Sequence, residues 1–172
     1  MRKGYVQVYT GHGKGKTTAA LGLAIRAAGA GMKVFFAQFI KKQRCSEHAA
    51  LDRFSDLITV RQYGMGLIRG GKPSDADVRA AQKGANEIIK AIVSEVYDVV
   101  ILDEANVAAH YGLILVGDLL DWIRLKPSQV ELIITGRYAD PKVIEAADLV
   151  TEMREIRHYH AKGVSARRGI EK

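Results

Sequence analysis

Residues 10–18 read Thr-Gly-His-Gly-Lys-Gly-Lys-Thr-Thr, and this stretch decides the fold. It follows an alternating, strand-like segment at 5–9 and opens a helix-like segment at 19–25. A glycine-rich turn between a strand and a helix gathers backbone N–H groups around one concavity, and the helix N-terminus adds partial positive charge. Lys16 would reach a bound phosphate chain, and the Thr17 hydroxyl would ligate Mg²⁺. The stretch therefore predicts a phosphate-binding loop rather than a tight glycine turn with a solvated lysine.

The loop differs in one respect from the general pattern, in which a glycine and four other residues precede Gly-Lys-Ser/Thr. Thr10 stands where that pattern has its first glycine, and Gly11, Gly13 and Gly15 follow it. Lys14 adds a second cation that the general pattern does not require. The loop is therefore either tighter at its start or a variant that wraps its anion differently.

The composition limits the class of protein. The chain has 172 residues, of which 48 % are hydrophobic, and this length fits one domain, 1–172, with a sizeable core. Cys45 is the only cysteine, which excludes an intrachain disulfide and fits a reducing compartment. No apolar stretch is long enough to span a membrane, and no secretory pattern opens the chain. We therefore expect a cytoplasmic protein without a membrane partner.

The formal net charge is +7, and its one concentration is a basic C-terminal tail at about 154–172. This tail is either a solvated segment or a set of cations that close over a polyphosphate. Aromatic residues make up only 7 % of the chain and show no stacking pattern, so we expect no nucleic-acid partner.

Short strand-like runs alternate with longer helical ones, which predicts an α/β fold with a mostly parallel sheet and helices on both faces. The strand candidates are 5–9, 34–39, 58–63, 99–102, 130–135 and 149–153. The clearest helix follows Ser74, a candidate N-cap with Asp77 three residues later, and its apolar face continues to Val96. Further helices are expected at 46–54, 113–124 and 141–147, the last with Asp140 as its N-cap.

The fourth predicted strand closes in two carboxylates, Asp103 and Glu104. In a nucleoside triphosphatase fold with a phosphate loop, a carboxylate at this place holds Mg²⁺ directly or through water. Glu104 either orients an attacking water, as in an ATPase, or serves the metal together with Asp103, and the strand pattern leaves both roles open. After the fifth strand, Arg137 either reaches phosphate oxygens with its planar guanidinium or is a surface arginine on a turn.

These motifs together resemble the corrinoid adenosyltransferases of the phosphate-loop type, which act on cob(I)alamin and on precursors such as cob(I)yrinic acid a,c-diamide. The family's loop, Gly-Asn-Gly-Lys-Gly-Lys-Thr-Thr, is matched by Gly11, His12, Gly13, Lys14, Gly15, Lys16, Thr17 and Thr18. The likeness covers nearly the whole chain, because residues 38–41, 102–104, 135–137, 147–153, 163–166 and 169–171 are also similar to family motifs.

The resemblance implies a reaction and its participants. The 5′-deoxyadenosyl group of ATP is transferred to Co(I) of a corrinoid with release of triphosphate, in adenosylcobalamin biosynthesis or salvage. Lys16 and Thr17 are the implied catalytic residues, and Thr17, Glu104 and Asp103 are the implied ligands of Mg²⁺. Residues 11–18, Arg26 and Arg137 are the implied ATP-binding residues. A homodimer and an external electron donor, such as a flavoprotein, are also implied.

Two places depart from the family. His12 stands where the family usually has asparagine. Residues 63–69, Tyr-Gly-Met-Gly-Leu-Ile-Arg, lack the Phe and Trp that the family tends to carry after Met-Gly. Those aromatic residues are thought to displace the lower axial ligand of the corrinoid. The corrinoid-side candidates here are Met65, Gly66, Leu67 and Ile68, with Leu67 and Ile68 supplying apolar bulk.

Two other functions also fit the residues. The first is a phosphate-loop ATPase or kinase, in which Asp103 or Glu104 activates water or a hydroxyl. The second is a nucleotide-binding regulatory module, in which ATP only orders the basic tail.

Overall fold

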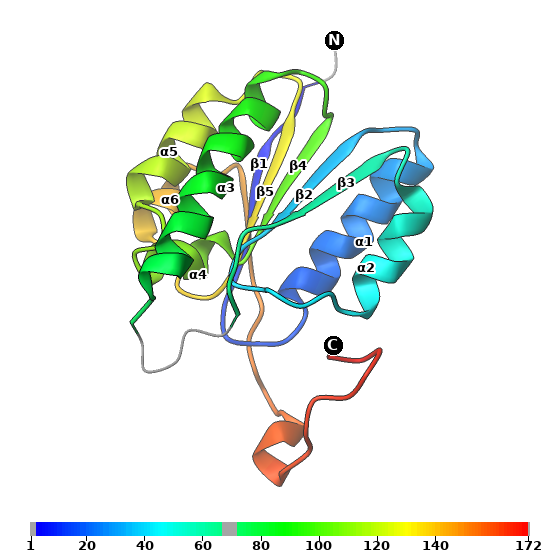
Figure 1. The fold of residues 1–172 in the computed structure, drawn as a ribbon, viewed down its shortest axis with the longest axis vertical. Helices are drawn as coiled ribbons and strands as arrows, with labels where there is room; N and C mark the ends of the chain where they lie inside the picture. Colours follow the sequence, from blue (N-terminus) through cyan, green and yellow to red (C-terminus); the bar gives the residue numbers. More distant parts are fainter. Residues whose placement is uncertain (1–2, 67–71, 172) are drawn as a thin grey trace.

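The computed structural model describes residues 3–66 and 72–171. In these residues six strands form one all-parallel sheet with the order β3-β2-β4-β5-β1-β6 (Figure 1). The strands are β1 (Val6–Thr10), β2 (Val34–Gln38), β3 (Ile58–Gln62), β4 (Val99–Asp103), β5 (Glu131–Thr135) and β6 (Leu149–Glu152). Each predicted strand agrees with an observed one to within a residue at either end, and the predicted parallel sheet is confirmed.

Helices cover both faces of this sheet, as the alternation of strands and helices predicts (Figure 1). One face carries α1 (Lys16–Gly29), α2 (Ser46–Leu51) and the 3-10 turn η1 (Asp52–Phe54). The other face carries α3 (Asp75–Val93), α4 (Ala105–His110), α5 (Val116–Leu125) and α6 (Pro141–Glu145). The central strands β2 and β4 are consequently buried at every position, which is why they are continuously apolar until their last residues.

The two apolar cores differ in the size of their side chains. α1 packs on the sheet through small residues, among them Ala20, Ala24 and Ala27, so this helix approaches the strands closely. The opposite core is filled by larger side chains of α3 and α5, such as Ile88 and Trp122. The close approach of α1 matters for function, because this helix starts at the glycine-rich loop.

The predicted helix caps are present at α3 and α6. Ser74 and Asp77 form a reciprocal capping box, in which the carboxylate of Asp77 accepts from the Ser74 N–H at 2.9 Å. The carboxylate of Asp140 accepts from the backbone N–H of Lys142 at 2.9 Å. The helix α3 nevertheless ends at Val93, so Val96, expected on its buried face, is an exposed loop residue.

The helix expected at 113–124 is wrong at its start. Leu113 and Ile114 are buried in the loop before α5, which begins at Val116. These two residues continue the apolar periodicity of the helix because the loop itself packs into the core. The short helix α4, which precedes this loop, was not predicted.

The C-terminal tail folds back beneath the sheet toward the loop after β1 (Figure 1). It forms a 3-10 turn, η3 (Tyr159–Lys162), and then reaches Lys14, whose Nζ donates to the carbonyl oxygen of Ile170 at 2.9 Å. Glu171 lies 3.6 Å from the same Nζ, and hydrogen bonds from Tyr159 and then Arg167 lower the pKa of Glu171 to about 2. The basic residues of the tail that the structure describes are exposed: Arg154, Arg157, Lys162, Arg167 and Arg168.

Among the described helices, none has the length and apolar character needed to cross a membrane.

Candidate functional site

The glycine-rich loop lies at the carboxyl edge of the sheet, between β1 and α1. Gly11 and Gly15 have φ angles of 92° and 122°, which residues with a side chain rarely adopt. The N–H of Gly13 donates to the carbonyl oxygen of Met153 at 2.7 Å, and a Cβ at position 13 would lie 2.8 Å from that oxygen. The loop is therefore seated on the chain that follows β6, and its glycines permit that contact.

Lys16, the first residue of α1, occupies the concavity of the loop. Its side chain is nearly buried, with 6 % exposure, and its Nζ donates to the carbonyl oxygens of Gly11 and Gly13, each at 2.7 Å. Burial lowers the pKa of Lys16, while the carboxylates of Glu104 and Asp103 act in the opposite direction. A cationic group is thus held among backbone groups at a helix N-terminus, which is a site for a phosphate chain.

Asp103 is fully buried at the end of β4 and is surrounded by donors. Its Oδ1 accepts from the hydroxyls of Thr17 at 2.9 Å and Thr135 at 2.8 Å, and its Oδ2 accepts from Gln38 Nε2 at 3.0 Å. Although β5 separates β1 from β4, α1 crosses the sheet and packs against β4. This crossing brings the Thr17 hydroxyl next to the carboxylate, as the two motifs predict.

Glu104 begins the turn into α4 with a left-handed backbone, at φ 60°. Its N–H donates to the Thr135 hydroxyl at 3.0 Å, so Thr135 supports both acidic residues. Burial, and then the negative charge of Asp103, raise the pKa of Glu104, while Lys16 opposes the shift. The two carboxylates therefore lie in different environments, since both oxygens of Asp103 accept hydrogen bonds whereas Glu104 faces the cleft.

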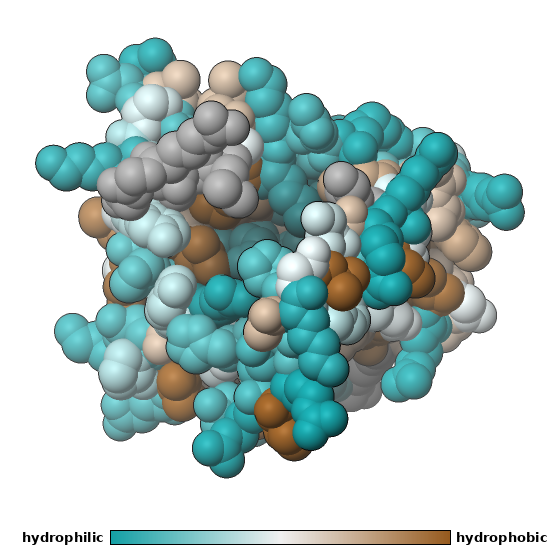
Figure 2. Space-filling view, turned by 90° about the horizontal axis from the view of Figure 1, so that it is seen from below, coloured by the Kyte–Doolittle hydropathy of each residue, from teal (hydrophilic) through white to brown (hydrophobic). Residues whose placement is uncertain are grey.

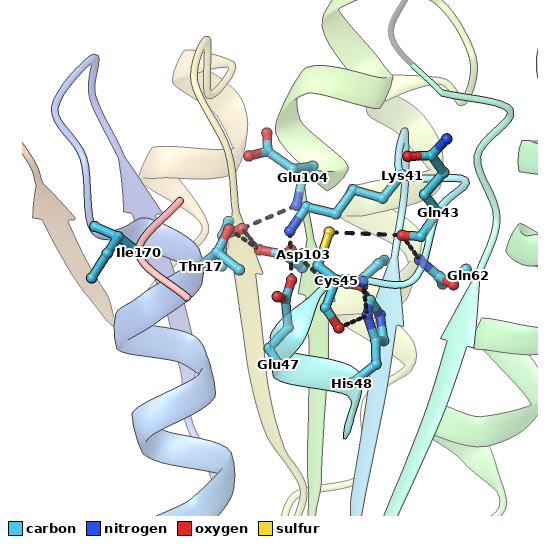
Figure 3. A network of polar contacts seen from close by, with 12 residues as sticks. Thr17, Lys41, Gln43, Cys45, Glu47, His48, Gln62, Asp103, Glu104 and Ile170 are labelled. Carbon is cyan, nitrogen blue, oxygen red and sulfur yellow. Dashed lines mark hydrogen bonds and ion pairs between the residues drawn. The ribbon is translucent and has the colours of Figure 1, made fainter. Parts of the chain in front are cut away.

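The wall opposite the loop carries an ion pair, with Lys41 Nζ 3.0 Å from Glu47 Oε1 (Figure 3). Burial by itself would lower the pKa of Lys41, but the negative charges of Asp103 and Glu47 outweigh it and raise the pKa. The amine of Lys41 points toward the carboxylates of Asp103 and Glu47 (Figure 3). Glu47 was not predicted, because a single glutamate in a polar segment carries no sequence signal.

One cleft of about 950 Å³ is lined by Lys16, Thr17, Glu104, Lys41 and Glu47, and it forms a hollow with a largely hydrophilic rim at the carboxyl edge of the sheet (Figure 2). The volume is that of a small-molecule or cofactor site. The predicted residues in its lining are His12, Gly13, Lys14, Gly15, Lys16, Thr17, Thr18, Glu104 and Arg137. The structure therefore brings together the loop, one acidic residue and the arginine that follows β5. Asp103 supports this lining through Thr17.

Several predicted residues lie elsewhere. Arg26 is exposed in the last turn of α1, outside the lining of the cleft. Met65 and Gly66 follow β3 and are not part of the lining either. Leu67 and Ile68 lie outside the described residues. The roles assigned to these positions stay predictions.

An aromatic group beside the loop was missed by the sequence analysis. Tyr138 stacks on His110, with ring centroids 4.1 Å apart, and meets the ring of His12 edge-on at 5.6 Å. The backbone of Tyr138 is left-handed, at φ 62°, a conformation that is uncommon for a bulky residue. Nothing in the sequence around the turn at 135–138 indicates this geometry.

The geometry defines a nucleotide-binding fold of the phosphate-loop class: a strand, a glycine loop with its lysine, a helix, and a buried aspartate on a parallel strand. The structure is similar to the crystal structure of the flagellar accessory protein FlaH from Methanocaldococcus jannaschii, with a TM-score of 0.64. The likeness covers 88 % of this chain and 72 % of that one at 12 % sequence identity. At this identity it shows the fold alone.

Sequence comparison then gives the family. The model of the ATP:corrinoid adenosyltransferases BtuR/CobO/CobP matches residues 2–171. The corrinoid adenosyltransferase of Pseudomonas aeruginosa is 34 % identical over 170 residues, covering 98 % of this chain and 84 % of the relative. That of Escherichia coli K12 is 32 % identical, covering 98 % and 86 %. The chain belongs to the ATP:corrinoid adenosyltransferase family, and it transfers the adenosyl group of ATP to the cobalt of a corrinoid. The resemblance seen in the sequence motifs is confirmed, in preference to an ATPase, a kinase or a regulatory module.

Proposed function

We propose that the cleft binds the triphosphate of ATP on the loop 11–18 and presents the ribose C5′ to Co(I) of the corrinoid. The observation that carries this proposal is the placement of buried Lys16 inside the loop, with Thr17 and Asp103 2.9 Å apart beside it. Lys16 and Thr17 act on the leaving triphosphate, and Arg137, which also lines the cleft, adds a planar cation. Arg26 lies about 15 Å further along α1, so its role requires the nucleoside to extend over that helix.

The reaction requires little proton transfer by the protein. Co(I) attacks C5′ with its own electron pair, so the Co–C bond forms while the C5′–O bond breaks and its electrons leave with triphosphate. Cobalt ends as Co(III), and no proton is removed from the nucleophile. The tasks left to the residues are positioning of the reacting atoms and stabilisation of charge on the leaving group. In this scheme Glu104 serves the cation and does not activate water.

The residues beside the loop fit a magnesium ion. Mg²⁺ prefers oxygen ligands and is usually held by one or two protein groups together with phosphate oxygens and water. The Thr17 hydroxyl, the Asp103 carboxylate and Glu104 form an all-oxygen set of donors at the loop. We propose that Thr17 ligates the ion, with Glu104 and Asp103 acting directly or through water. The ion supplies positive charge for the departing triphosphate.

The corrinoid side is proposed from the sequence motif at 65–68. Met65 and Gly66 follow β3 at the same edge of the sheet as the cleft, and Leu67 and Ile68 continue the motif outside the described residues. We also propose a cytoplasmic homodimer that receives electrons from an external donor such as a flavoprotein.

The function is tested by incubating the enzyme with ATP, Mg²⁺ and chemically reduced cob(I)alamin, and recording the cobalamin spectrum. We expect conversion to adenosylcobalamin that depends on both ATP and Mg²⁺. Release of ADP in the absence of corrinoid would instead support an ATPase, and unchanged ATP with unchanged cobalamin would leave only nucleotide binding.

A further inference from the structure

A chain of buried polar groups runs from the start of α2 to Asp103. Gln38 is 0 % exposed and His48 is 2 % exposed, and neither lines the cleft. The N–H of Cys45 donates to His48 Nδ1 at 2.8 Å, and His48 Nε2 lies 2.6 Å from Gln38 Oε1. Gln38 Nε2 then donates to Asp103 Oδ2 at 3.0 Å. Figure 3 shows Cys45 and His48 on one side of Asp103 and Thr17 on the other.

The direction of each hydrogen bond follows from the carboxylate at the end of the chain. A carboxylate only accepts, so the amide nitrogen of Gln38 must face Asp103 and its carbonyl oxygen must face His48. A carbonyl oxygen also only accepts, so the proton of the neutral imidazole belongs on Nε2. Nδ1 is then the acceptor for the Cys45 N–H. One arrangement of protons therefore satisfies every member, from Cys45 to Asp103.

Packing alone does not require these residues. Leu51, three residues after His48 in α2, is a buried apolar side chain, so this helix is also able to pack on the sheet through apolar residues. A buried polar group left without a partner costs about 1–3 kcal/mol. The four polar groups avoid this cost only together, because each completes the next. Their common end is Oδ2 of Asp103, the one oxygen that neither Thr17 nor Thr135 contacts.

We propose that His48 is a positioning residue for adenosyl transfer. Through the carboxamide of Gln38 it fixes the carboxylate of Asp103 in the orientation that holds the magnesium ion of ATP. The proposal rests on the proposed role of Asp103 at the cation. The same hydrogen bonds connect two sides of the cleft. Cys45, whose N–H orients His48, immediately precedes α2, and α2 carries Glu47 into the opposite wall.

Two substitutions of His48 separate a positioning role from a packing role. In His48→Gln the side-chain amide nitrogen reaches the place of Nε2 and can still donate to Gln38. In His48→Asn the shorter amide reaches only the place of Nδ1, so Gln38 loses its partner and can rotate. Loss of an outer-shell partner costs roughly 10–100-fold in metal affinity.

The measurement is titration of Mn²⁺ into the full-length protein with ATP and without corrinoid, followed by electron paramagnetic resonance. His48→Asn should weaken Mn²⁺ binding about tenfold, and His48→Gln should remain within about threefold of the parent. The Mg²⁺ concentration for half-maximal turnover should shift in parallel, while the KM for cob(I)alamin stays unchanged.

Asp103→Asn separates the role of Asp103 at the cation from the positioning role of His48. If Asp103→Asn leaves Mn²⁺ binding unchanged, the proposed role of Asp103 is wrong. If Asp103→Asn weakens binding but His48→Asn does not, or if both His48 variants weaken it equally, the positioning role is overturned. Should His48→Asn fail to fold, Gln38→Leu removes the same donor, and a normal Mn²⁺ affinity in that variant would also overturn the inference.

Discussion

Replacing Lys16 with methionine should remove most of the enzyme's use of ATP while leaving the fold in place. The Nζ of Lys16 is held by two carbonyl oxygens of the loop, each at 2.7 Å, so its charge is already in the concavity before ATP arrives. Methionine retains an unbranched, flexible stem of similar length but carries no charge. Because burial lowers the pKa of Lys16, the substitution also removes a charge that the fold holds out of water.

The size of the effect follows from the contact that is lost. A charge-assisted contact to the leaving group, in a site with little water, is worth roughly 2–4 kcal/mol in the transition state. At about 1.4 kcal/mol for each factor of ten, kcat/KM for ATP should fall roughly 30- to 1,000-fold. The two hydrogen bonds that the substitution removes lie within the loop itself, so we expect only a small change in the melting temperature.

The assay is adenosylcobalamin formation from pre-reduced cob(I)alamin over a range of ATP concentrations. Lys33→Met is the matched control, because Lys33 is exposed just before β2, at the opposite edge of the sheet. A folded Lys16→Met enzyme whose kcat/KM equals that of the control would refute the assignment of the loop.

Three further substitutions test other parts of the site. Glu104→Gln should lower activity in a way that added Mg²⁺ partly restores, and a variant that binds Mn²⁺ normally yet is inactive at every Mg²⁺ concentration would favour water activation instead. Without ATP the same variant should melt higher than the parent at neutral pH. Because the pKa of Glu104 is raised, the native parent binds this proton more readily than the unfolded chain does, and the stability of the parent falls as pH rises through that range. The higher melting temperature of the variant should therefore vanish below about pH 4, and its persistence there would contradict this cause. Gly13→Ala should lower the free energy of unfolding by about 1–3 kcal/mol, since its Cβ would meet the Met153 carbonyl oxygen at 2.8 Å, and an unchanged denaturation midpoint would show that the loop does not rest there. Leu67→Asp should impair turnover of cob(II)alamin with a mild reductant more than turnover of Co(I), and equal losses with both would place the motif at 65–68 in another role.

The loop and the acidic strand end could be predicted because their signals are local. The glycines, Lys16 and Thr17 form a continuous stretch, and Asp103 closes an apolar strand. Parallel strands end at one edge of the sheet, so the two motifs had to meet once the fold class was known. The distance between the two motifs depends on how closely α1 packs on the sheet, and the small residues of α1 determine that distance.

The opposite wall could not be predicted, because it depends on contacts between distant residues. Gln38 and Asp103 are 65 residues apart in the sequence, and His48 neither lines the cleft nor belongs to a recognisable motif. A single histidine in a short helical segment is indistinguishable from a surface histidine until β2 is placed beside β4. The same reason hides the ion pair of Lys41 and Glu47.

The missed helix α4 has a different cause. Glu104 precedes it in a left-handed conformation, and its N-terminus lacks a side-chain cap. The usual start signals are therefore missing, and the strand passes into the helix through the site residue itself. Strained backbone at a cleft residue is common at functional sites, where local sequence rules are least informative.

The most direct test of the central claim is the molar ratio of triphosphate to adenosylcobalamin, measured by phosphorus NMR and absorption in one reaction of ATP, Mg²⁺ and cob(I)alamin. If the loop 11–18 holds the leaving group while Co(I) attacks C5′, one triphosphate appears for each adenosylcobalamin formed, and both are lost together in Lys16→Met. Formation of ADP in place of triphosphate, or adenosylcobalamin at the parental rate in Lys16→Met, would contradict the account.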